Sequence, residues 1–134
     1  MPSQIGRYQL QRTLGTGANS KVKLGIHMDN GHKSAIKILK KSDPTVDANF
    51  LNLLMTEVET MSKLSHPNIV NMYEYSKDAN VEKENGTKVP VVCIALELAE
   101  GGELFDYVAL GGAFSERTCR FYFRQLLDGL NYVH

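Results

Sequence analysis

The sequence predicts an α+β protein in which a five-stranded antiparallel sheet and one large helix come first and two further helices follow. Two observations indicate strands, because apolar residues alternate with polar ones from Tyr8 to Leu14 and again from Val22 to Ile26. A third observation indicates helices, because apolar residues recur every three or four positions in the stretches 51–64 and 119–133. The fold class therefore follows from a change of hydrophobic period along the chain.

The composition is that of an ordinary globular protein. The chain has 134 residues, which is enough for one core, and 15 basic residues balance 15 acidic ones to a net charge of zero. This balance argues against a generally basic nucleic-acid binder and against an acidic tail. No apolar run reaches the roughly 18 residues of a membrane span. We therefore expect neither nucleic acid nor a membrane as a partner.

The cysteines and the start of the chain indicate a reducing compartment. Cys93 and Cys119 lie far apart in the sequence, in apolar stretches, and have no metal-ligand spacing. Two reduced, partly buried thiols are expected rather than a disulfide, and no metal site is predicted. The first six residues lack the basic and apolar blocks of a signal peptide. A cytoplasmic, possibly nuclear, location is expected.

Turn-forming residues mark where one predicted strand ends and the next begins. Asn30-Gly31 favours a tight turn, after which a third strand over about 34–40 should pair back on the second. Two further strands are expected over 69–75 and 89–98, the last of them nearly continuous in apolar residues. The polar stretch 76–88 between them is predicted to be a solvated loop at the edge of the sheet.

Capping residues mark where the predicted helices begin. Asp47 is a good N-cap for a helix that runs to about Leu64, and Ser115 is one for the last helix. A short helix is expected over 103–109 after the Gly101-Gly102 joint. The last helix carries an apolar stripe with nothing after it to pack on, which indicates a truncated domain. A helix that folds back onto the sheet is the alternative.

A glycine loop joins the first two strands. Gly15-Thr16-Gly17 is followed by the alternating stretch from Lys21, whereas a dinucleotide-binding loop would open a helix. Between antiparallel strands such a loop forms a flap, and its backbone, free of side chains, can approach phosphate oxygens closely.

Lys37 and Glu57 are the candidate charged pair. On the third strand Lys37 follows the small Ala35, which leaves room for a flat base beside a fixed cation. A long lysine side chain needs a carboxylate to hold it, and Glu57, at the border of the apolar helix face, can supply one. A solvated lysine and a surface glutamate are the alternative interpretation of the two residues taken singly.

Four motifs occur in order along the chain: Leu14-Gly15-x-Gly17-x-x-Ser20-x-Val22, Ala35-Ile36-Lys37, Glu57 followed by Leu64-Ser65-His66-Pro67-Asn68-Ile69-Val70, and Leu96-Glu97-Leu98-Ala99-Glu100-Gly101-Gly102-Glu103-Leu104-Phe105-Asp106. Together they resemble the N-terminal part of a eukaryotic protein kinase domain, and in particular the calcium/calmodulin-dependent and AMP-activated group of Ser/Thr kinases. The resemblance runs from about Tyr8 to His134.

This resemblance implies a kinase N-lobe over residues 8–100, followed over 101–134 by the hinge exit and the first two helices of an incomplete C-lobe. It implies ATP as the bound nucleotide. The positions that it assigns to ATP are Leu14, Gly15, Gly17, Val22, Ala35, Lys37, Leu96, Glu97, Ala99 and Glu103.

The family implies a role for each position. Lys37 would bind the α- and β-phosphates and pair with Glu57, and these two are the catalytic candidates. Leu96 would be the gatekeeper at the back of the pocket. The carbonyl of Glu97 and the N–H of Ala99 would bind the adenine edge. Glu103 would reach the ribose or a basic substrate residue.

Two departures from the family pattern stand out. Ser20 replaces the third glycine of the flap and Asn19 the usual aromatic residue at its tip. The family's His-Arg-Asp and Asp-Phe-Gly segments, which supply the catalytic base and the Mg²⁺ ligands, have no counterpart in these residues. The resemblance therefore implies a longer parent that uses ATP and Mg²⁺ to phosphorylate protein Ser and Thr. The alternative is an inactive truncated kinase or pseudokinase that binds nucleotide or a partner.

Overall fold

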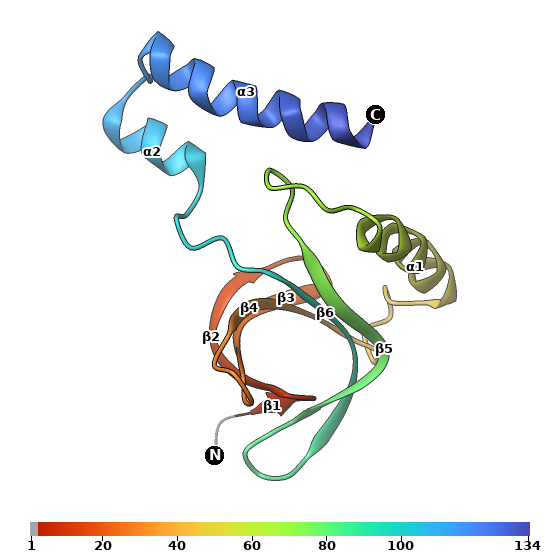
Figure 1. Ribbon diagram of the computed structural model, residues 1–134. Coiled ribbons are helices and arrows are strands. Elements are labelled where there is room, and N and C mark those ends of the chain that lie inside the picture. The colour runs from red at the N-terminus through yellow and green to blue at the C-terminus, as the bar shows by residue number, and fades with distance from the viewer. Residues whose placement is uncertain (1–2) are drawn as a thin grey trace. The chain divides into compact units, whose positions relative to one another are not determined.

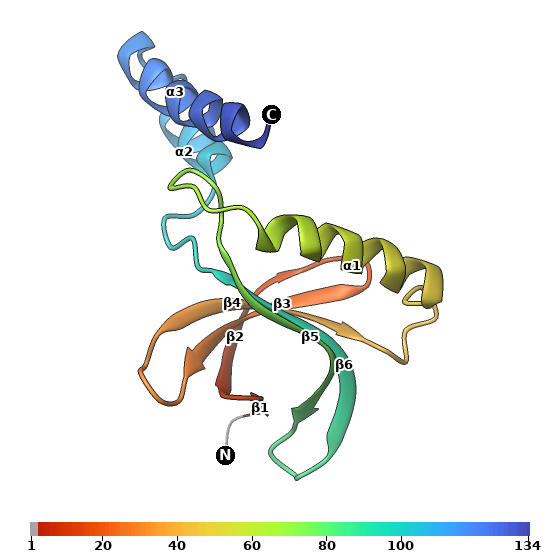
Figure 2. The ribbon, with the colours of Figure 1, turned by 45° about the vertical axis from the view of Figure 1, so that its right-hand side comes forward.

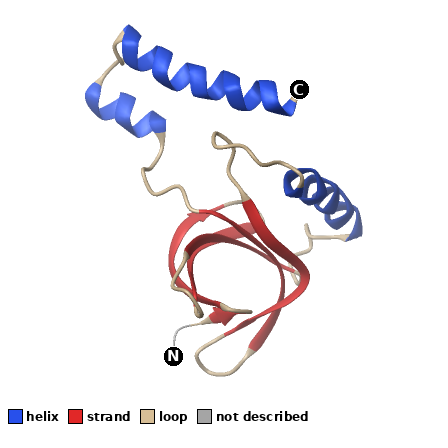
Figure 3. Cartoon of the chain, viewed as in Figure 1, coloured by secondary structure: helices blue, strands red, loops and turns tan. Residues whose placement is uncertain are grey.

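The computed structural model describes residues 3–134, which fall into two compact units. The first unit comprises the described residues up to 63 together with 71–98, and the second comprises 64–70 and 99–134. Figure 3 separates the element types: all strands belong to the first unit, and the last two helices belong to the second.

A closed antiparallel barrel forms the first unit (Figure 1). Its strands lie in the order β1-β2-β3-β4-β6-β5. Their bounds are β1 Gln4–Ile5, β2 Tyr8–Thr16, β3 Ser20–His27, β4 Lys33–Lys40, β5 Met72–Glu82 and β6 Lys88–Glu97. The two residues of β1 close the barrel, because Gln4 and Ile5 pair with β2 on one side and with β5 on the other.

Alternation along each strand divides the sheet into an interior and an outer face. On β4, Ile36 and Ile38 point into the barrel and are buried with Tyr8, Leu10 and Ile5. The interior cluster also contains Val91, Cys93 and Ala95 of β6. The residues between them in sequence belong to the outer face, so a register shift of one residue would expose this whole core.

Helix α1, Ala48–Ser62, covers part of the outer face. The carboxylate of Asp47 caps it by accepting the N–H of Phe50 at 2.8 Å, as its position predicts. Leu54 and Val58 are buried against the sheet, and Figure 2 shows the helix lying along the outside of the barrel. They share a cluster with Leu39, Val46, Val92 and Ile94. The one large helix expected beside the sheet is therefore confirmed.

The prediction of a solvated loop over 76–88 is wrong. Residues 76–82 continue β5, residue 88 already begins β6, and only 83–87 form the turn. The reason is a weak alternation among polar residues: Ala79 faces Val91 and Val81 faces Val89, and both pack against the barrel interior. On the solvent side Asp78 forms an ion pair with Lys41.

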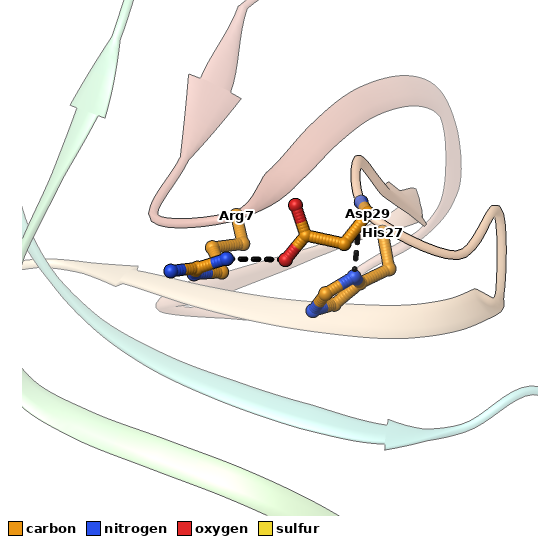
Figure 4. Close-up of polar contacts among 3 residues, drawn as sticks. All are labelled: Arg7, His27 and Asp29. Carbon is orange, nitrogen blue, oxygen red and sulfur yellow. Dashed lines mark hydrogen bonds and ion pairs between the residues drawn. The ribbon is translucent and has the colours of Figure 1, made fainter.

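The sequence predicts five strands, and the structure adds a sixth, the short strand β1. Two residues are too short for a detectable alternation, so the sequence carries no signal for them. Next to β1, Arg7 forms an ion pair with Asp29 in the turn between β3 and β4, and the N–H of Asp29 donates to Nδ1 of His27 (Figure 4). The pair is exposed, so the barrel closes mainly through backbone pairing and the burial of Ile5.

The second unit contains α2, Leu104–Gly111, and α3, Glu116–Val133. Ser115 caps α3 by accepting the N–H of Thr118, as expected. Residues 64–70 pack on this helix: the N–H of Ser65 donates to the hydroxyl of Tyr132 at 3.0 Å. A Cβ added to Gly129 would lie 3.3 Å from the carbonyl oxygen of Asn68. The strand expected from residue 69 therefore begins only at Met72.

The apolar stripe of α3 lies open to solvent in the described chain. Phe123, Leu126, Leu130 and Val133 are each roughly half exposed or more. Cys119 is exposed too, so the expectation of a partly buried thiol is wrong for this residue. Only Gly129 of α3 is buried. No described helix is long and apolar enough to span a membrane.

The two free thiols should differ sharply in reactivity. Burial in the barrel, with a smaller effect from the charge of Glu74, raises the pKa of Cys93 to about 12. At pH 8 Cys93 is therefore a protonated thiol shielded from reagents, whereas Cys119 is exposed. We expect a thiol reagent such as dithionitrobenzoate to label one cysteine quickly and the second only on unfolding. Fast labelling that survives the substitution Cys119→Ser would contradict this assignment.

Candidate functional site

The glycine loop is the tight end of the hairpin formed by β2 and β3. Gly15 pairs with Val22 and Thr16 with Lys21, so the ladder continues almost to the tip. The N–H of Gly17 donates to the carbonyl of Ser20 at 2.8 Å and closes the turn. Leu14, which precedes Gly15 near the tip of the hairpin, is exposed. The flap expected between two antiparallel strands is therefore present.

Ser20 crowds the space beside position 17. A Cβ built on Gly17 would lie 3.0 Å from the hydroxyl oxygen of Ser20, which is tighter than ordinary contact. The serine that replaces the family's third glycine thus occupies the space that a side chain at position 17 would need. Asn19, at the tip, is half-buried. The hairpin keeps a bare backbone at Gly15 and Gly17, which is what close approach of an anion requires.

Lys37 lies on the outer face of β4, half-buried, between Val22 of β3 and Ile94 of β6. Directly opposed residues on neighbouring strands share a face, so these three side chains belong to one surface. Two positions earlier, Ala35 lies between Leu24 and Leu96. The outer face next to the glycine hairpin is therefore apolar, with a small residue at Ala35 and one cation at Lys37.

Glu57 lies on α1, one position before the buried Val58, but its own side chain is exposed. Within residues 3–134 no ion pair or hydrogen bond joins Glu57 to Lys37. The helix packs on the sheet through Leu54 and Val58, so Glu57 borders the contact without entering it. The pairing of Glu57 with Lys37 stays a prediction.

The remaining predicted residues divide between the two units. Glu97, at the end of β6, is held to Asn71: the N–H of Glu97 donates to the carbonyl of Asn71 at 2.8 Å, and its carboxylate accepts the N–H of Asn71 at 2.9 Å. Ala99 and Glu103 belong to the second unit and are exposed. Glu103 is the N-cap residue of α2, but its side chain makes no capping hydrogen bond.

Two residues of this region escaped the sequence reasoning. Ile94 is the direct neighbour of Lys37, and strand alternation from Leu96 would have placed it on the same face. Asn71 fixes the end of β6 through its two hydrogen bonds with Glu97. No local pattern indicates that contact, because the residues lie 26 positions apart.

This arrangement can hold an anion next to a flat apolar group. A half-buried lysine on an apolar face supplies a positive charge that solvent screens less than a fully exposed one, and the glycine hairpin lets the backbone approach an anion closely. Among residues 3–134 no group of three or more His, Cys, Asp or Glu side chains is placed to hold a metal ion.

Comparison with known proteins decides the family. The family described as the protein kinase domain matches residues 8–134. The chain belongs to the protein kinase family. The six-stranded antiparallel sheet with α1 corresponds to a kinase N-lobe, and α2 and α3 correspond to the start of a C-lobe.

Curated relatives of this kinase chain are Ser/Thr protein kinases. It is 37% identical over 131 residues to CBL-interacting protein kinase 24 of Oryza sativa subsp. japonica and 38% identical over 131 residues to CBL-interacting serine/threonine-protein kinase 1 of Arabidopsis thaliana. It is also 37% identical over 131 residues to the probable serine/threonine-protein kinase MARK-B of Dictyostelium discoideum. Each alignment covers 98% of this chain but only 26%, 27% and 17% of these relatives, in that order.

Proposed function

We propose that this chain is the ATP-binding portion of a protein Ser/Thr kinase. The observation that carries the proposal is the position of Lys37, a half-buried lysine on the outer face of β4 beside the glycine hairpin. Phosphoryl-transfer enzymes of this family use a strand lysine for the phosphates and a glycine-rich loop to cover them. Both parts occur here on adjacent strands in one unit.

The apolar surroundings support a purine base next to the phosphates. Ala35 presents only a methyl group, and Val22 and Leu96 are half-buried near it on the same outer face. A flat aromatic base can lie against such a surface, with its phosphates toward Lys37. Leu14 would close over the base from the hairpin. The backbone of Glu97, at the end of β6 in the same unit, would contact the adenine edge. The roles that the family resemblance assigns to Ala99 and Glu103 stay predictions.

Replacing Lys37 with methionine tests the site. Methionine keeps an unbranched side chain and removes the charge, so the fold should persist while the phosphates lose their cation. Titration of ATP into the 134-residue chain by calorimetry should show binding that weakens at least tenfold in Lys37→Met. The matched control is Lys63→Met, which removes an exposed lysine at the end of α1 and should change the affinity less than twofold. Equal affinities for all three proteins would overturn the assignment.

In the longer protein that the relatives indicate, we propose transfer of the ATP γ-phosphoryl to protein Ser and Thr hydroxyls, with Mg²⁺ held by residues outside this chain. For the chain alone the second candidate function is nucleotide binding without transfer. Its support is that, within the described residues 3–134, no ion pair joins Lys37 to Glu57. Incubation with ATP and a Ser/Thr-rich peptide, followed for transfer of the γ-phosphoryl group to the peptide and for the ADP formed, should show no product above the blank. Product formed by the wild-type chain and lost in Lys37→Met would exclude this second candidate.

A further inference from the structure

The mouth of the barrel beside the glycine hairpin contains a cavity of about 700 Å³, and all the residues that line it belong to the first unit. This volume lies within the range of about 300–1,000 Å³ that small-molecule sites occupy. Residues 17–20 of the hairpin form one wall. The cavity opens on the interior face of β4, whereas Lys37 lies on the outer face. It therefore lies on the opposite face of the sheet from Lys37 and shares only the tip of the glycine hairpin with the proposed nucleotide site.

The floor of this cavity is aliphatic. Five apolar side chains from four strands meet there: Leu10, Ile38, Val81, Val89 and Val91. Leu10, Ile38 and Val91 belong to the buried core, and Val81 and Val89 are partly buried against it. No aromatic residue lines the cavity, so it offers no ring on which a nucleic-acid base or a nucleoside could stack. A floor of this kind accommodates an aliphatic chain.

The rim of the cavity is cationic. Lys21 and Lys23 stand opposite Ile38 and Ile36 on the interior face, at strand positions where a buried barrel would carry apolar side chains. Four lysines line the cavity against two carboxylates: Lys21, Lys23, Lys40 and Lys83 against Asp43 and Glu84. In the described part of the chain none of these lysines forms an ion pair.

One of the two acidic residues of the rim, Asp43, is held within its own turn. Asp43 accepts hydrogen bonds from the N–H and the hydroxyl of Thr45 at 2.9 and 2.7 Å, and these bonds lower the pKa of Asp43 below its ordinary value. Its carboxylate is thus occupied within its own turn. The excess of positive charge above an aliphatic floor complements a ligand that has an apolar body and an anionic head.

We propose that this cavity binds a small amphipathic anion, an unbranched aliphatic chain ending in one carboxylate. The aliphatic chain lies on the valine, leucine and isoleucine floor, and the carboxylate lies among Lys21, Lys23, Lys40 and Lys83. The carboxylate stays in the cationic rim at the mouth, where it remains partly hydrated. This site requires neither the nucleotide nor the second unit.

The test uses the 134-residue chain, decanoate as the probe and 1-decanol as the uncharged counterpart, both below their aggregation limits. We expect calorimetry to show decanoate binding, with shifts of the methyl NMR signals of Val81, Val89 and Val91. The double substitution Lys21→Met with Lys23→Met should weaken decanoate binding at least tenfold and change decanol binding less than twofold. Lys63→Met is the matched control and should leave decanoate binding within twofold of the wild type.

A second variant tests the floor independently of the rim. Val89→Phe places a ring in the cavity and should weaken decanoate and decanol alike, at least tenfold. Circular dichroism in the absence of ligand confirms that each variant is folded. The proposal is overturned if decanoate binds the lysine double variant as it binds the wild type, or if Val89→Phe leaves both probes unaffected. It is also overturned if inorganic phosphate displaces decanoate at equal concentration, because the site would then recognise an anion alone.

Discussion

The substitution Gly25→Ala is expected to destabilise the barrel by about 3 kcal/mol, at the upper end of the usual overpacking range. A Cβ on Gly25 would lie 2.5 Å from Cγ1 and 3.0 Å from Cδ1 of Ile36, and 3.3 Å from the ring of Tyr8. Ile36 is fully buried, so its side chain has no free space into which to move. Urea denaturation followed by circular dichroism measures the loss in the free energy of unfolding.

Two further variants make this prediction specific. Gly15→Ala is the control, because a Cβ there meets nothing within 4 Å, and its unfolding free energy should stay within about 0.5 kcal/mol of the wild type. Ile36→Ala removes the atoms that clash with the new methyl group. The combination of Gly25→Ala with Ile36→Ala should therefore cost clearly less than the sum of the two single substitutions. Strict additivity of the two costs would show that the clash is not the cause.

The substitution Val58→Ala should lower the free energy of unfolding by about 2 kcal/mol, through lost burial and the cavity left beneath α1. Val58 is 1% exposed and packs with Leu39, Val92 and Ile94 on the outer face of the sheet. Val58 and Leu54 are the two buried residues of α1. The same denaturation experiment measures the effect.

Leu53→Ala is the matched control on the same helix. Leu53 is 75% exposed, so removing its side chain should change the stability by less than about 0.5 kcal/mol. The comparison separates the packing of α1 from its helix propensity, because alanine is a better helix former than either original residue. If both substitutions cost the same, α1 is not anchored through Val58. The position of the adjacent Glu57 would then need another explanation.

Strong periodicity made most of the fold predictable. The alternation around Tyr8 and Val22, the Asn30-Gly31 turn and the Asp47 cap each correspond to an element of the structure. These signals are local, so they do not depend on knowing the rest of the fold. The extension of β5 was missed because its inward residues are small, and Ala79 contributes little to a hydrophobic pattern. Strand β1 was missed because it consists of two residues whose pairing is entirely with distant strands.

The sequence predicts which residues belong to the candidate site from the order of the motifs, but it does not predict all of their contacts. Sequence places Gly15, Gly17 and Lys37 on adjacent strands, and strand pairing then brings Val22 next to Lys37. Whether Glu57 meets Lys37 depends on the rotation and position of a whole helix, which local pattern does not specify. The cationic mouth of the barrel could not be predicted from the sequence either. Lys21 and Lys23 look like solvated strand residues until their pairing with Ile38 and Ile36 on the neighbouring strand β4 places them on the interior face.

The closure of the sheet by β1 has a consequence for self-association. An open sheet ends in strands whose unpaired N–H and C=O groups can recruit a strand from another molecule. In this protein Gln4 and Ile5 pair with both β2 and β5, so neither β2 nor β5 presents a full free edge. Many of the exposed apolar side chains lie on α2 and α3, at residues such as Phe105, Leu110 and Leu126. We therefore expect these helix faces to contribute more to self-association of the chain than strand addition does.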